Sequence, residues 1–253
     1  MRLACKIGLE IKTNIEDILS EYDQAAAAFS CELRHDSSDY DLMMVKQRYL
    51  LASAALIKNA SEIFGYQDIS RAASFFEAAA WAYLDESDRW AYRQRLDNRF
   101  ILNEESSRFL RSRLKAGAER ANKILQAYIR ELQDTSSPDV STLRFLLYLV
   151  QELPTGAWEC APCLAVCGKC GECGYGRDHG ICAHPGSTYE MLVSSREAIL
   201  KSIRRGLIED CRRPGAENLK NVKTGFLDDY SESSRAQMEI DICGEHDIVE
   251  ECD

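Results

Sequence analysis

The chain has 253 residues, 45% of them hydrophobic, and a net charge of −10, so it can bury an apolar core without disulfide bonds. Its longest strongly apolar run, FLLYLV at 145–150, is far shorter than the roughly 20 residues of a membrane-spanning helix. The N-terminal stretch is interrupted by charges and lacks the apolar segment of a secretory signal, so we expect a soluble, cytoplasmic protein without a membrane partner.

Residues 1–153 show the periodicity of helices, and no segment alternates in the manner of a half-buried strand. Apolar residues that recur at steps of three and four predict helices over about 3–33, 40–64, 68–84, 88–101, 103–133 and 138–153. Gly65 is expected to end the second helix, Asp68 and Asn103 to cap the third and fifth, and Pro138 to begin the sixth. The predicted fold is mainly α, either a multi-helix bundle or an array of helical hairpins.

The third of these segments, ISRAASFFEAAAWAYLDESD at 69–88, alternates small residues with aromatic ones. It resembles one helix of a tetratricopeptide repeat, in which small residues sit at helix crossings. No second copy follows at the period of about 34 residues that such repeats have. The alternative interpretation is an alanine-rich core helix that packs closely on its neighbours.

Six of the eleven cysteines lie in CAPCLAVCGKCGECGYGRDHGIC at 160–182. Because thiols are kept reduced in the cytosol, clustered cysteines there more often bind a metal than form disulfides. Thiolate sulfur and imidazole nitrogen suit zinc, and the glycines and prolines at 154–186 suit tight turns around an ion better than a helix. The candidate metal ligands are Cys160, Cys163, Cys167, Cys170, Cys173, His179, Cys182 and His184.

The later part of this stretch resembles a zinc knuckle of the Cys-Cys-His-Cys class, carried by Cys170, Cys173, His179 and Cys182. The knuckle has four residues on each side of the histidine, whereas this chain has five before it and two after it. The resemblance implies one zinc ion on these four residues, and the other four candidates would then bind a second. A six-thiolate cluster that holds two metal ions is also compatible with the sequence.

An iron–sulfur cluster is the alternative cofactor. Cys167, Cys170 and Cys173 match the first three ligands of the bacterial ferredoxin run C-x2-C-x2-C-x3-C-P. The next cysteine, Cys182, follows after eight residues instead of three, and it could still close a 4Fe–4S cluster. In that case the protein would transfer electrons or serve as an enzyme accessory.

A helix is predicted again after the cysteines, because Ser187 and Glu190 form a capping box and RPG at 213–215 ends the segment. From Ala216 onward, eleven acidic residues against three basic ones give a net charge of −8 with little pattern, so we expect disorder there. The predicted organisation is a helical domain at 1–153, a metal-binding module at 154–186, a helix at 187–213 and an acidic tail at 214–253.

Two basic segments are candidates for contacts with nucleic acid. Arg108, Arg111 and Lys115 share one predicted helix, and Arg204 and Arg205 lie on the helix after the cysteines. Acidic residues interrupt both segments, and the body of the chain is not basic. Nucleic acid is therefore an alternative partner to another protein.

No P-loop, GxSxG or GxGxxG motif occurs, and no free histidine or carboxylate is conspicuously placed as a general base. The sequence thus favours a non-enzymatic protein without a small-molecule substrate. The leading hypothesis is a helical scaffold or adaptor with structural zinc, one or two ions, that presents a surface to a protein partner. The alternatives are the iron–sulfur protein and a zinc-dependent regulator that binds nucleic acid.

Overall fold

The computed structural model describes residues 2–33, 39–97, 102–134, 138–166, 169–173, 176, 182 and 184–212. The chain divides into two units, Met1–Leu207 and Ile208–Asp253, and only 208–212 of the second unit are described. The acidic tail predicted at 214–253 lies outside the described residues. Among the helices of the described ranges, none combines the length and the apolarity that a membrane crossing requires.

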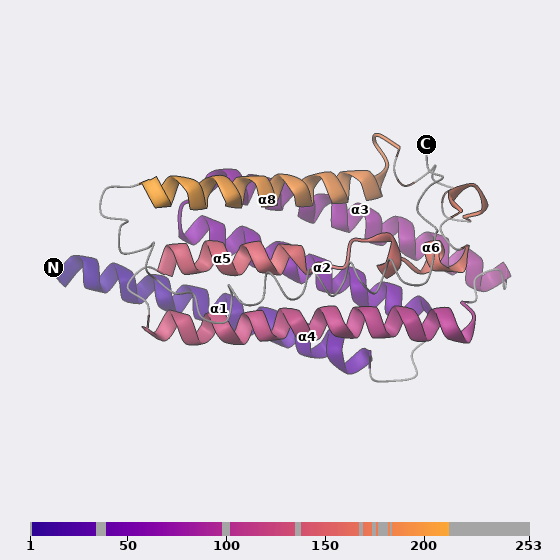
Figure 1. Cartoon of the computed structure of the whole chain (residues 1–253), viewed down its shortest axis with the longest axis horizontal. Coiled ribbons are helices and arrows are strands. Elements are labelled where there is room, and N and C mark those ends of the chain that lie inside the picture. Colours follow the sequence, from indigo (N-terminus) through magenta and orange to yellow (C-terminus); the bar gives the residue numbers. More distant parts are fainter. Residues whose placement is uncertain are drawn as a thin grey trace. The chain divides into compact units, whose positions relative to one another are not determined.

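The described residues form a bundle of α-helices without a strand, as the sequence predicts (Figure 1). The long helices are α1 (Arg2–Glu32), α2 (Asp39–Ile63), α3 (Gln67–Asp97), α4 (Glu104–Asp134), α5 (Pro138–Gln151) and α8 (Thr188–Arg212). Between α5 and α8 the described residues include the short helices η1 (Ala157–Glu159), α6 (Ala161–Ala165) and η2 (Cys170–Glu172).

Helix α2 packs against both α1 and α3. The turn from α2 to α3 is tight because Gly65 adopts a φ of +75°, which a residue with a Cβ rarely takes. Alanines on both helices, including Ala54, Ala60 and Ala73, are completely buried. Small side chains at these positions let the two helix backbones approach closely, which supports the interpretation of an alanine-rich core helix.

The third helix differs from its prediction. The segments expected at 68–84 and 88–101 form one continuous helix, α3, which runs to Asp97. The sequence predicts a break between 84 and 88, but no glycine or proline lies between 85 and 97 to stop the helix. Helix α3 also begins one residue earlier than predicted, at Gln67. The carbonyl oxygen of Tyr66 accepts the N–H groups of Ile69 and Ser70, so Asp68 lies in the first turn and is not the cap.

Helices α4 and α5 pack together through an aromatic pair. The rings of Tyr128 and Phe145 stack with their centroids 4.3 Å apart, and the Tyr128 hydroxyl lies 2.5 Å from Thr142 Oγ1. Asn103 caps α4 as predicted, because its Oδ1 accepts the N–H of Ser106 at 2.7 Å. The predicted apolar stripe of α4 is buried throughout (Leu110, Leu114, Ala118, Ala121, Leu125, Tyr128 and Leu132).

Helix α8 lies beside α5, which separates it from α4 in Figure 1. Arg196 of α8 donates to the carbonyl oxygens of Val150 and Gln151 at 2.9 and 3.0 Å. The last carbonyls of a helix have no partner within it, so a guanidinium there satisfies them and complements the negative end of α5. Gly206 contributes close packing, since a Cβ at this position would meet Leu143 of α5 at 3.3 Å.

Candidate metal centre

The cysteine-rich stretch begins with the turn that leads from α5 into η1 and α6. Cys160 ends η1 and is the N-cap residue of α6, and Cys163 lies inside that helix. Pro162 sits in the first turn of α6, where its missing N–H costs no helical hydrogen bond. The expectation that 154–186 is too irregular for a helix is therefore wrong for 157–165, where the C-x2-C pair is carried by a short helical turn.

Glu159 fastens this turn to two long helices. The Nζ of Lys46, on α2, donates to the Glu159 carbonyl oxygen at 2.8 Å. Arg113, on α4, donates to the Glu159 carboxylate through Nε at 3.2 Å and Nη2 at 2.7 Å. Lys46 is only 3% exposed, so its ammonium group lies almost entirely out of water and needs the carbonyl as a partner.

Two tyrosines, Tyr83 and Tyr189, lie in the neighbourhood of Cys160. The Tyr83 hydroxyl lies 3.8 Å from Cys160 Sγ, and the Lys46 ammonium lies 5.9 Å from the centre of the Tyr83 ring. The ring of Tyr189, from the first turn of α8, is 5.8 Å from that of Tyr83, and its hydroxyl donates to the Thr155 carbonyl at 2.5 Å. Cys160 is consequently 4% exposed and has both a hydroxyl and a positive charge nearby.

The thiols of Cys160 and Cys163 share a hydrogen bond that shifts their pKa values in opposite directions. This bond, helped by the charge of Lys46, lowers the pKa of Cys160 to about 6 although burial opposes the change. The same bond, followed by burial and by the charges of Cys160, Cys182 and Cys173, raises the pKa of Cys163. Negative charge is thus favoured on the sulfur of Cys160, beside the buried Lys46 ammonium.

The second half of the stretch contributes two more described thiols. Cys173 is 5% exposed, and its Sγ accepts the backbone N–H of Gly176 at 3.5 Å. The carbonyl oxygen of Cys182 accepts the hydroxyl of Ser187 at 2.5 Å. Amide hydrogen bonds to sulfur are a common outer-shell feature around thiolate ligands, because they stabilise the charge on sulfur.

Ser187 also begins α8, as predicted, because its Oγ accepts the N–H of Glu190 at 3.0 Å. The reciprocal half of the predicted capping box differs. The Glu190 carboxylate accepts the N–H of Gly186 at 3.5 Å, and Gly186 has a φ of +87°. The positive φ explains why a glycine precedes the helix at this position.

The eight predicted ligands therefore fall into three groups. Cys160, Cys173 and Cys182 lie near enough to Cys163 for their charges to raise its pKa. His184 is exposed. The side chains of Cys167, Cys170 and His179 lie outside the described residues.

The described thiols do not close a coordination sphere. Among the described residues, no three histidine, cysteine or acidic side chains lie close enough together to hold a metal ion. Electrostatic effects between thiolates extend over several ångströms, whereas zinc–sulfur bonds are about 2.3 Å long. The four cysteines thus share one neighbourhood without sharing one centre.

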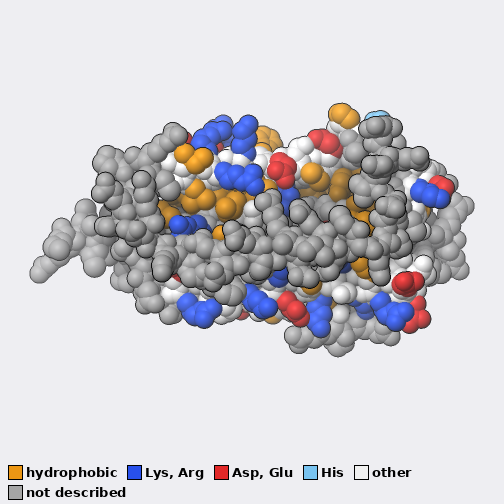
Figure 2. Space-filling model, in the orientation of Figure 1, with side chains coloured by type: hydrophobic (Ala, Val, Ile, Leu, Met, Phe, Trp, Pro, Cys, Tyr) orange, Lys and Arg blue, Asp and Glu red, His pale blue; other side chains and the backbone are white. Residues whose placement is uncertain are grey.

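The predicted nucleic-acid contacts occupy two separate places. Arg108, Arg111 and Lys115 lie on α4 and Arg204 and Arg205 on α8, with α5 between these helices, and basic side chains gather over both in Figure 2. Lys115 lies 4.0 Å from Glu119 and Arg205 lies 3.4 Å from Asp68, so acidic neighbours partly neutralise each set. Binding of nucleic acid stays a prediction.

The sequence interpretation missed the side chains that hold the C-x2-C turn in place. Lys46 lies between the apolar residues at 43–45 and 49–51 of α2, but Gln47 and Arg48 follow it directly, so the sequence alone does not single it out. Arg113 gives no signal either, because it lies among other basic residues of α4.

Compared with known proteins, the chain matches no family model, no curated protein and no solved structure.

Proposed function

We propose that the protein is a helical adaptor whose cysteine-rich stretch holds one structural zinc ion through Cys160, Cys163, Cys173 and Cys182. The observation behind this proposal is that Cys160, Cys182 and Cys173 lie near enough to Cys163 for the hydrogen bond with Cys160 and the charges of all three to help raise its pKa. Their spacing, C-x2-C-x9-C-x8-C, gives the two-residue separation with which a thiol pair grips a tetrahedral ion.

The electrostatics around the thiols support four-cysteine ligation. Four thiolates on a divalent ion leave a net charge of −2, which is costly in a buried place unless positive groups compensate it. Lys46 supplies one buried positive charge, and the N–H of Gly176 supplies a hydrogen bond to the sulfur of Cys173. Ligation would need the four sulfurs to lie closer together than they do in the structure.

The proposed role of the ion is to stabilise a stretch that has little core of its own. Within 154–187 the described structure offers short helices and turns, with buried apolar side chains in α6 and polar contacts from α2, α4 and α8. In small loop-rich modules, metal binding supplies the free energy of folding. The long helices would then present the surface that a protein partner recognises.

Metal content tests the proposal directly. Protein purified without oxygen and analysed for elements is expected to contain one zinc ion per chain, and Cys173→Ser is expected to lose it. Cys31→Ser is the matched control, because Cys31 is an exposed cysteine on α1 and should leave the zinc content unchanged. Cobalt in place of zinc is expected to give the strong visible absorption of a tetrahedral thiolate site.

Two results would contradict the proposal. If the purified protein contains iron and sulfide and has a broad absorption at ~400 nm, it holds an iron–sulfur cluster instead. If the purified protein contains no metal and all four thiols react with an alkylating reagent, these cysteines do not bind a metal ion. A zinc chelator should increase hydrogen exchange at 154–187 and leave exchange in α2 and α3 unchanged.

A further inference from the structure

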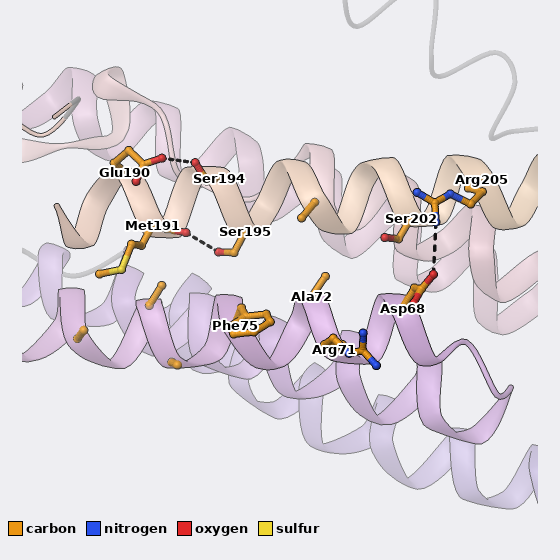
Figure 3. A pocket seen from close by; sticks show the side chains of 14 residues that line it. Asp68, Arg71, Ala72, Phe75, Glu190, Met191, Ser194, Ser195, Ser202 and Arg205 are labelled. Atoms are coloured by element: carbon orange, nitrogen blue, oxygen red, sulfur yellow. Dashed lines mark hydrogen bonds and ion pairs between the residues drawn. The ribbon is translucent and has the colours of Figure 1, made fainter. Parts of the chain in front are cut away.

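A groove of about 700 Å³ runs between α3 and α8 (Figure 3). Its floor contains Ala72 and Ala79 from α3 and Ser195 and Ala198 from α8. Phe75 stands in the groove and is 65% exposed, which is unusual for a phenylalanine on a helix that otherwise packs into a core.

Two serines that line the groove are already hydrogen-bonded within α8. The hydroxyl of Ser195 donates to the carbonyl oxygens of Met191 and Leu192, and that of Ser194 donates to the Glu190 carboxylate. These serines therefore offer few free hydrogen bonds to an occupant. Small side chains and the exposed faces of Phe75 and Met191 favour an apolar surface that approaches closely.

The two ends of the groove carry opposite charge. At one end Asp68 pairs with Arg205 at 3.4 Å, and the exposed Arg71 adds a positive charge that this pair does not neutralise. At the other end lies Glu190, in the first turn of α8. The groove is therefore polarised along its length by these side chains, and helices α3 and α8 run antiparallel on its two sides (Figure 3).

We infer that this groove binds one amphipathic α-helix of a protein partner. From Asp68 to Ala82 the α3 side of the groove extends for about 21 Å at 1.5 Å per residue, which fits a helix of about four turns. Such helix-in-groove recognition uses apolar side chains at steps of three and four. The inference names the partner class of the proposed adaptor and rests on the interaction part of that function, but it does not require the metal.

Charge complementarity fixes the direction of the bound helix. Acidic residues of the partner belong opposite Arg71, and basic residues belong opposite Glu190. Isolated helices are themselves stabilised by acidic residues in the first turn and basic residues in the last. Both preferences are met when the partner helix starts at the Arg71 end and runs parallel to α3.

A synthetic peptide tests this geometry on the full-length protein. The probe is a fluorescein-labelled helical peptide of about four turns with a leucine and alanine stripe, glutamates in its first turn and lysines in its last. A second peptide has the same stripe with the glutamates and lysines exchanged. In fluorescence anisotropy the first peptide is expected to bind about fivefold more tightly at low salt, and added salt should reduce the difference.

Two matched variants locate the binding surface. Phe75→Asp places a charge in the groove and is expected to weaken binding of the first peptide about tenfold or more. Trp81→Asp is the control, because Trp81 is also on α3 and 57% exposed but does not line the groove. Circular dichroism and thermal unfolding of both variants establish that each is folded.

Three results would overturn the inference. Equal affinity for the two peptides would show that charge does not set the direction of the bound helix. Equal weakening by Phe75→Asp and Trp81→Asp would show that the peptide binds outside the groove. A dimer in light scattering that Phe75→Asp dissociates would make a second copy of the chain the occupant. Failure of the zinc proposal has a separate signature, because metal content is measured without the peptide.

Discussion

The helical core and the cysteine-rich stretch are held in place by different interactions. In the core, side chains such as Ile57, Phe76 and Phe145 are 0% exposed and pack only because neighbouring helices bring apolar faces together. In the stretch, the Thr155 and Glu159 carbonyl oxygens are bound by hydroxyl and ammonium groups from distant helices. Periodic apolar residues therefore specify the bundle, whereas the stretch depends on particular polar partners and on the proposed ion.

The largest expected effect is a cavity in the bundle. Phe76→Ala removes a completely buried ring from α3 and is expected to lower the free energy of unfolding by about 3–5 kcal/mol. Phe75→Ala, one residue away but 65% exposed, should change it by less than about 0.5 kcal/mol. Urea unfolding followed by circular dichroism measures both, and similar values for the two variants would contradict the assigned core.

The second expected effect is a loss of stability of the bundle at alkaline pH. The hydroxyls of Tyr22 and Tyr49 lie 2.6 Å apart in the core, and burial raises the pKa of Tyr49 to about 12. The folded state keeps this phenol protonated, so the stabilisation is complete below pH 10 and is lost as the pH rises from 10 towards 12. The loss for Tyr49 alone amounts to about 3 kcal/mol.

The alkaline effect is checked by urea unfolding at several pH values between 9 and 12. Tyr49→Phe cannot ionise, so its stability should fall less steeply with pH than that of the unmodified chain. An equally steep fall in the variant would show that other groups carry the alkaline sensitivity.

The smallest effect separates a half-buried ion pair from an exposed one. Arg113→Ala leaves the Glu159 carboxylate without its partner at 2.7 Å and is expected to cost about 1–2 kcal/mol, mainly as faster hydrogen exchange around 157–165. Arg205→Ala breaks a pair whose side chains are 54% and 65% exposed and should cost less than about 0.5 kcal/mol. Equal exchange in both variants would mean that Glu159 does not anchor the cysteine turn.

Most of the bundle was predictable from the sequence, because helix periodicity and capping are local properties. Asn103, Pro138 and Ser187 begin their helices as predicted, and the stripe of α4 is buried as predicted. The continuous helix α3 was not, because the break predicted between 84 and 88 contains no residue that stops a helix. Polarity indicates which face meets water, and glycine or proline is needed to indicate an end.

The sequence predicts which residue types form the candidate site, but not which of these residues lie together in the folded chain. Spacing selects cysteines and histidines as ligands, yet it cannot show which thiols the folded chain brings together. The approach of Cys173 and Cys182 to Cys163 depends on turns, and the surroundings of Cys160 come from α2, α3 and α8. Tertiary neighbours such as Lys46 lie more than a hundred residues away in the chain, so no local pattern predicts them.

One serine joins the two regions. The hydroxyl of Ser187 donates to the Cys182 carbonyl and accepts the first-turn N–H of Glu190, and Glu190 and Met191 line the α3–α8 groove. This oxygen atom would therefore couple zinc binding in the cysteine-rich stretch to binding of the proposed partner helix at that end of the groove. Because linkage is reciprocal, zinc would favour the partner helix by the same factor by which the partner helix favours zinc.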